Sequence, residues 1–182
     1  MRVMKGLGAV AVSALLGWVF LAPAVGAWAF AAAEFAFLAW IARELRRTDA
    51  AAVRARARSP LEPDEAEIVS RYPLYFQRPA LARESSSTLA AIGLASLIAV
   101  PWLTYKLQWA PAILIGVLLF AVARLTKVLS PVYTLRLATA KGDRNALRLL
   151  SAHDGAARKL SAPEQPETQG EAGRQENREG GD

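Results

Sequence analysis

Residues 6–41 read GLGAVAVSALLGWVFLAPAVGAWAFAAAEFAFLAWI and contain one charged side chain, that of Glu34. A helix needs about 20 apolar residues to cross the hydrocarbon core of a bilayer, so this run is too long for a single span. Pro23 and Gly26 favour a break in its middle. We therefore predict two spans, residues 6–21 and 24–42, which make a first hairpin within residues 1–42.

A second apolar block has the same layout. Two spans are expected over residues 87–103 and 111–130, joined by a short polar connection. A soluble chain would distribute its apolar residues periodically around one core, whereas these stretches are apolar on all faces. The predicted fold class is an all-α integral membrane protein with four transmembrane helices in two hairpins, the second over residues 87–130.

Positive charges alternate between the connections. Lysine and arginine precede the first span, fill residues 43–86 and follow the fourth span, but the two short turns hold only Lys106. Cytoplasmic segments of membrane proteins carry the excess of basic residues, so both termini are expected in the cytoplasm. The bias towards alanine and arginine is typical of a GC-rich bacterial genome. We thus expect a multi-pass protein of the inner (plasma) membrane.

The beginning of the chain also has the features of a secretory signal peptide. Arg2 and Lys5 precede an apolar run that reaches the small residues Ala22 and Ala24 around Pro23. Cleavage there would leave three spans. Against cleavage, the apolar run continues directly into the next span, and the sequence leaves both interpretations open.

The polar segments are expected to be partly helical. Residues 43–86 form a basic cytoplasmic loop, in which the second span continues as a helix to Arg58 and a new helix starts at Pro63. Residues 131–160 are predicted to form one or two amphipathic helices on the membrane surface. Residues 161–182 contain almost no apolar side chains, which predicts a disordered tail.

An aromatic segment interrupted by prolines follows in the cytoplasmic loop. Arginines flank tyrosine and phenylalanine there, a composition that suits the headgroup layer of a membrane. It is either an interfacial linker or a recognition segment for a lipid headgroup or a protein partner. The candidate binding residues are Arg71, Tyr72, Tyr75, Phe76 and Arg78.

Glu34 lies near the middle of the second predicted span. A carboxyl group at that depth is costly, so it should face the bundle and be neutral. It is a candidate site for coupling to protons or cations, or else a structural group that hydrogen-bonds a neighbouring helix or pairs with Arg124. Small residues at four-residue spacing, such as Ala91, Ala95 and Ala99, suit close helix packing or self-association.

Enzyme chemistry finds little support in the sequence. The chain has no cysteine, which excludes thiolate nucleophiles and cysteine metal sites. No phosphate-binding loop, nucleophile elbow or zinc-protease motif occurs. His153, the single histidine, is predicted to be a solvated surface residue whose neighbour Asp154 points elsewhere. No catalytic residue, metal or cofactor is expected.

Three functions remain as hypotheses. The first is a scaffold, assembly or accessory factor that acts through its cytoplasmic loop. The second is a small ion- or proton-coupled transporter or channel that uses Glu34, and the third is an enzyme acting on lipid near residues 72–83. Because basic residues collect beside the spans, the net charge of +6 indicates anionic lipid headgroups as partners, with a protein partner or a second copy as further options, and not nucleic acid.

Overall fold

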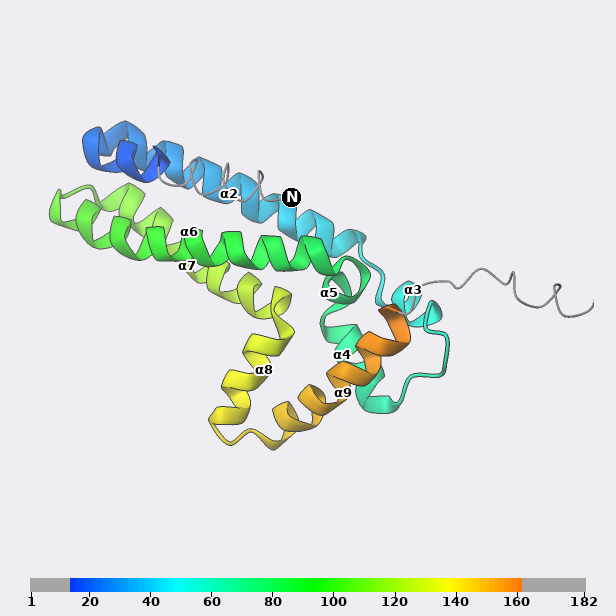
Figure 1. Cartoon of the computed structure of the whole chain (residues 1–182). Coiled ribbons are helices and arrows are strands. Elements are labelled where there is room, and N and C mark those ends of the chain that lie inside the picture. Colours follow the sequence, from blue (N-terminus) through cyan, green and yellow to red (C-terminus); the bar gives the residue numbers. More distant parts are fainter. Residues whose placement is uncertain (1–13, 162–182) are drawn as a thin grey trace, which may run out of the picture.

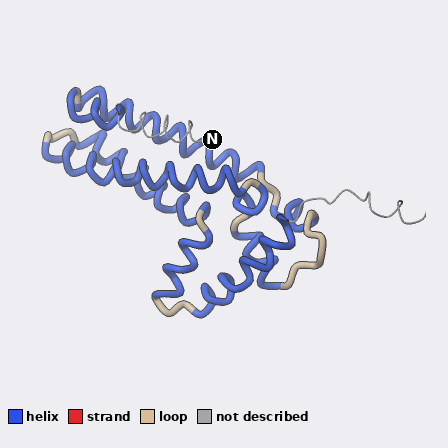
Figure 2. The backbone as a smooth tube through the Cα atoms, viewed as in Figure 1, coloured by secondary structure: helices blue, strands red, loops and turns tan. Residues whose placement is uncertain are grey.

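The structure is a computed structural model that describes residues 14–161. The described part contains helices and no strands, connected mostly by short loops (Figures 1 and 2). A short helix over residues 14–21 comes first. The others are α2 (Pro23–Arg47), α3 (Ala50–Ala55), α4 (Pro63–Arg71), α5 (Pro73–Gln77), α6 (Pro79–Tyr105), α7 (Trp109–Leu129), α8 (Pro131–Ala140) and α9 (Arg144–Ser161).

Three of the described helices, α2, α6 and α7, are long and apolar enough to cross a membrane. They coincide with three of the four predicted spans. The fourth predicted span, residues 6–21, lies mostly outside the described residues, as does the predicted disordered tail. The described part therefore has three candidate spanning helices and not four, and the break predicted at Pro23 is the start of α2.

The three long helices form an elongated bundle (Figure 1). Its core contains Phe30, Ile41, Leu89, Leu103 and Ile115, among others. The outward faces are also apolar. Large side chains that remain exposed on them include Trp28, Phe35, Leu94, Leu97, Ile98, Ile113, Val117 and Phe120.

Aromatic side chains gather at the end of the bundle where α6 turns into α7. Phe20 lies 5.1 Å from Trp102 between ring centroids, and Trp102 lies 6.1 Å from Tyr105. The Lys106 ammonium stands 5.2 Å from the Trp102 ring centre. An aromatic cluster with one cation is typical of a membrane interface, where an apolar ring meets water at its edge.

The predicted boundaries of two helices were wrong. The helix of the second span does not continue to Arg58, because the backbone is extended at Thr48 and Asp49 caps a separate helix, α3, by accepting from the Ala51 amide. The helix of the third span begins at Pro79, well before residue 87. The hydroxyl-rich stretch of residues 85–88 lies inside α6.

A second, smaller body of helices, here called the polar lobe, consists of α3, α4, α5, α8 and α9. Figure 1 shows α8 leading away from the bundle and α9 returning beside α4. The lobe has its own apolar core. Its buried members are Val53, Ile68, Val69, Tyr72, Leu135, Ala146, Leu149 and Ala156.

A sharp bend separates α7 from α8. Pro131, the first residue of α8, has no amide hydrogen to donate to the carbonyl of Lys127. The Thr134 hydroxyl shares its one hydrogen between the Ser130 carbonyl at 2.8 Å and, more weakly, the Lys127 carbonyl at 3.3 Å. The bend is therefore hydrogen-bonded where a proline would otherwise leave a carbonyl group unpaired, and it directs α8 away from α6.

Candidate functional site

Glu34 faces the interior of the bundle, as predicted. Its side chain is 2 % exposed, and the Ser96 hydroxyl of α6 donates to its Oε1 at 3.1 Å. The other carboxyl oxygen, Oε2, is buried without a hydrogen-bond partner among the described residues. The contact joins α2 to α6 in the way expected of a structural carboxyl group, while Oε2 can still accept a further hydrogen bond.

Arg124 does not pair with Glu34. It is exposed on α7, and its guanidinium carbon lies 5.7 Å from the centre of the Phe120 ring. Both residues were expected in spans, but the sequence does not say which face of its helix Arg124 occupies. The structure thus does not bring together the two halves of the predicted intramembrane polar site.

The two arginines of the predicted recognition segment are already engaged. Arg71 lies 3.5 Å from Glu67, one turn earlier on α4. Arg78 donates to Glu44, a mostly buried carboxylate near the end of α2. This second pair ties the end of α2 to the start of α6, so Arg78 has a structural contact at the junction of bundle and lobe.

The aromatic residues of the same segment have different surroundings. Tyr72 is buried in the core of the polar lobe, where desolvation raises the pKa of its phenol and the charge of Arg71 offsets only part of the shift. Phe76 packs against that core. Tyr75 lines a large cavity beside α6, α7 and α8, and it is the one member of the predicted set that reaches this cavity.

His153 is not the solvated residue that the sequence predicted. Its side chain on α9 is mostly buried, with its ring centroid 5.5 Å from that of Tyr75 and 5.8 Å from that of Phe76. Its Nδ1 lies 3.0 Å from the Asp154 carboxylate, although adjacent side chains were expected to diverge. The prediction failed because α5 covers this face of α9. No group of three or more metal-ligand side chains occurs in residues 14–161.

A cavity of about 970 Å³ opens where α6, α7 and α8 meet. Its apolar walls come from α6 and α7 and include Leu89, Gly93 and Val122. The bend before Pro131 turns α8 away from α6 and leaves this space open. The polar side chains that line it are Tyr75, Arg83, Ser86, Ser87, Thr126, Lys127, Ser130, Tyr133, Thr134 and Arg136.

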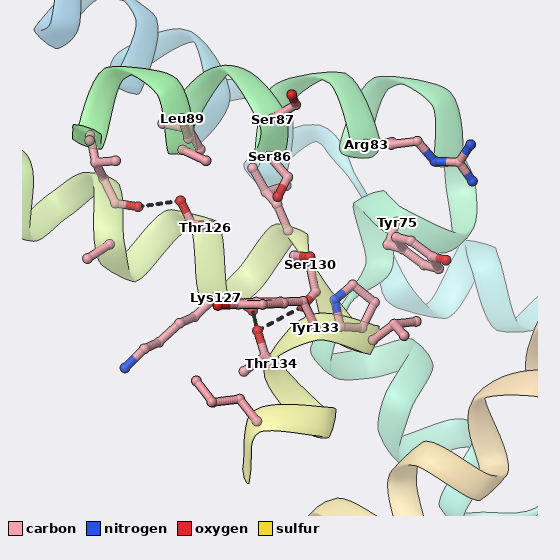
Figure 3. A pocket seen from close by; sticks show the side chains of 18 of the residues that line it. Tyr75, Arg83, Ser86, Ser87, Leu89, Thr126, Lys127, Ser130, Tyr133 and Thr134 are labelled. Atoms are coloured by element: carbon pink, nitrogen blue, oxygen red, sulfur yellow. Dashed lines mark hydrogen bonds between the residues drawn. The ribbon is translucent and has the colours of Figure 1, made fainter. Parts of the chain in front are cut away.

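Figure 3 shows how the polar end of the cavity is assembled from separate elements. Arg83 and Tyr75 lie on one side, from the first turns of α6 and from α5, and Ser86 projects from α6 towards Ser130. Sequence reasoning missed the cavity, since its lining comes from residues 75 to 137. The available signal was the cation and the hydroxyl groups of Arg83, Ser86 and Ser87 at the start of the third predicted span.

No protein-family model, curated protein or solved structure matches this chain.

Proposed function

We propose that the protein is an integral membrane protein that acts without catalysis, as a scaffold, assembly factor or accessory subunit, through its polar lobe. The observation that carries this proposal is the lobe itself, a folded body with its own core attached to one end of an apolar bundle. The apolar outer faces of α2, α6 and α7 support insertion, because residues such as Phe35 and Val117 suit lipid and not water.

Ion pairs hold the lobe together and favour a contact role. Arg148 of α9 contacts Asp64 and Glu67 of α4, and Lys159 contacts Glu65. Leu147 of α9 remains 56 % exposed beside these pairs. A folded surface that presents an apolar side chain with charges around it is suited to a protein partner.

The contact role predicts site-specific crosslinking. A photoreactive phenylalanine in place of Leu147 should give discrete protein adducts in cells, while the same residue in place of Val117, which is similarly exposed on the bundle, should give none. Adduct mass on denaturing gels is the measurement. Adducts at Val117 alone, or at neither position, would rule the proposal out.

The transporter hypothesis keeps one supporting observation, the unpartnered Oε2 of Glu34. Under the scaffold proposal, the wild-type protein and Glu34→Gln should leave the proton permeability of liposomes equal to that of protein-free vesicles. An internal pH dye measures this, with an ionophore as the positive control. Proton flux through the wild type that Glu34→Gln abolishes would favour a coupled transporter instead.

The proposed orientation, with the polar lobe in the cytoplasm, can be tested by labelling because the chain has no cysteine. Cysteines at Leu21 and Lys106 should react with an impermeant maleimide in intact cells. Cysteines at Arg56 and Ser151 should react only after permeabilisation. All four positions are exposed. Labelling of Arg56→Cys in intact cells would overturn the orientation.

A further inference from the structure

We propose that the cavity between α6, α7 and α8 binds one anionic phospholipid, with the phosphate at the basic end and an acyl chain along the apolar walls. The proposal rests on the membrane insertion proposed above but not on the partner of the polar lobe. The candidate cations are Arg83, Lys127 and Arg136, which line the cavity together with hydroxyl groups.

The charged residues that line the cavity are all positive. Three of its residues are cationic and none is acidic. Elsewhere in the polar lobe and at its junction with the bundle, cations such as Arg78, Arg148 and Lys159 contact carboxylates. Within residues 14–161, no carboxylate forms an ion pair with any of the three cavity cations. An anionic ligand would balance the charge of these three cations. A phosphate group can accept hydrogen bonds from arginine and from hydroxyls.

The length of the lining fits one leaflet of a bilayer. Along α6 it extends from Arg83 to Leu97, which corresponds to about 21 Å at the rise of an α-helix. Half of a bilayer, headgroups included, measures about 20–22 Å. Apolar residues occupy the part of α6 from Leu89 to Leu97, while the cation and the serines occupy the part nearer the lobe. This order, apolar and then cationic, matches a phospholipid.

A second copy of the chain fits the same cavity poorly. A twofold interface would place the same patch of both copies against each other, so the partner's lining would offer the three cations no carboxylate. Leaving these cations unpaired in a partly apolar setting is unfavourable, because opposite charges are absent from the lining. Charge complementarity therefore selects an anionic occupant over a homodimer.

Native mass spectrometry of the full chain in detergent tests the proposal, with phosphatidylglycerol and phosphatidylcholine of the same chain length as probes. The wild type should retain one phosphatidylglycerol with an affinity about ten-fold or more above that for phosphatidylcholine, because three cations line the cavity. Replacing Arg83, Lys127 and Arg136 by glutamine should remove this preference. The matched control replaces Arg47, Lys141 and Arg144, two arginines and a lysine that are exposed outside the cavity, and should keep it.

A second pair of variants tests the acyl-chain part. Ala90 lines the cavity and Ala91 is exposed but does not line it. Ala90→Phe should displace the bound lipid, and Ala91→Phe should not, while both keep the wild-type melting temperature. Equal retention of both lipids, equal losses in both triple variants, equal binding of glycerol phosphate without chains, or a lipid-free dimer would each overturn the proposal.

Discussion

Replacement of Gly26 by leucine is expected to separate the helix of residues 14–21 from α2. A side chain at this glycine would collide with the backbone of the helix of residues 14–21. Its Cβ would lie only 2.6 Å from the Val19 nitrogen and nearer still to the Trp18 carbonyl. Backbone atoms cannot move aside as a flexible side chain can. Overpacking lowers the free energy of unfolding by about 1–3 kcal/mol even where side chains relax. For Gly26→Leu we expect a decrease at or above the top of that range.

The matched control for this prediction is Gly116→Leu. Gly116 lies on α7, and a Cβ added to it would have no neighbouring atom within 4 Å, so a leucine there should be tolerated. Thermal unfolding in detergent, followed by size-exclusion chromatography, measures both variants. If Gly26→Leu melts at the same temperature as Gly116→Leu, the close approach of the two segments is wrong.

Replacement of Glu65 by alanine should undock α9 from α4. Glu65 Oε2 accepts from the Glu62 amide at 2.9 Å, which caps α4, and from the Lys159 ammonium at 2.6 Å, which holds α9. The carboxyl group also packs over Gly155. Loss of the cap costs about 1 kcal/mol, and leaving the lysine without its partner adds about 1–3 kcal/mol.

Glu65→Gln separates the two contributions, since glutamine can keep the cap but carries no charge. It should weaken the docking of α9 less than Glu65→Ala does. Spin labels on cysteines at Ser70 and Ser151, exposed positions on α4 and α9, report the docking as an inter-label distance. An unchanged distance distribution in Glu65→Ala would contradict the prediction.

The same contact should make docking sensitive to acid. Burial alone would raise the pKa of Glu65, but the hydrogen bonds from Lys159 and from the Glu62 amide, together with the lysine charge, lower it below its usual value. A carboxyl group with a lowered pKa stabilises the folded state fully above its unfolded pKa of about 4.5, and the stabilisation is lost as the pH falls through the folded value. The spin-label distance should therefore broaden below about pH 4.5, and Lys159→Met should reduce this dependence.

The apolar spans could be predicted because their signal is local. Each of α2 and α7 contains an 18-residue stretch that is apolar enough to cross a membrane, so their positions follow from composition. The start of α6 was missed because a search for apolar stretches does not detect the more polar residues 79–86 with which this helix begins. Pro79 was the usable signal, since proline is favoured in the first turn of a helix, and Pro23, Pro63, Pro73 and Pro131 also begin helices here.

The candidate sites could be predicted only in part. The burial of Glu34 follows from the cost of a carboxyl group in an apolar run, but its partner Ser96 lies 62 positions away in the chain. The burial of His153 depends on α5 lying over α9, and the cavity depends on the angle at which α8 leaves α7. Angles between helices are set by packing over many residues, and no single stretch of sequence carries them.

The return of α9 beside α4 has a consequence for the order of synthesis. The polar lobe is assembled from helices made before the α6–α7 hairpin and helices made after it. While a ribosome is still producing α7, the apolar side chains of Ile68 and Val69 on α4 are not yet covered by α9. In a chain inserted as proposed, α9 can pack against α4 only after α7 has crossed the membrane, because that crossing places α8 and α9 on the same side as α4. Completion of the lobe would then report that the hairpin has entered the membrane with the correct number of crossings.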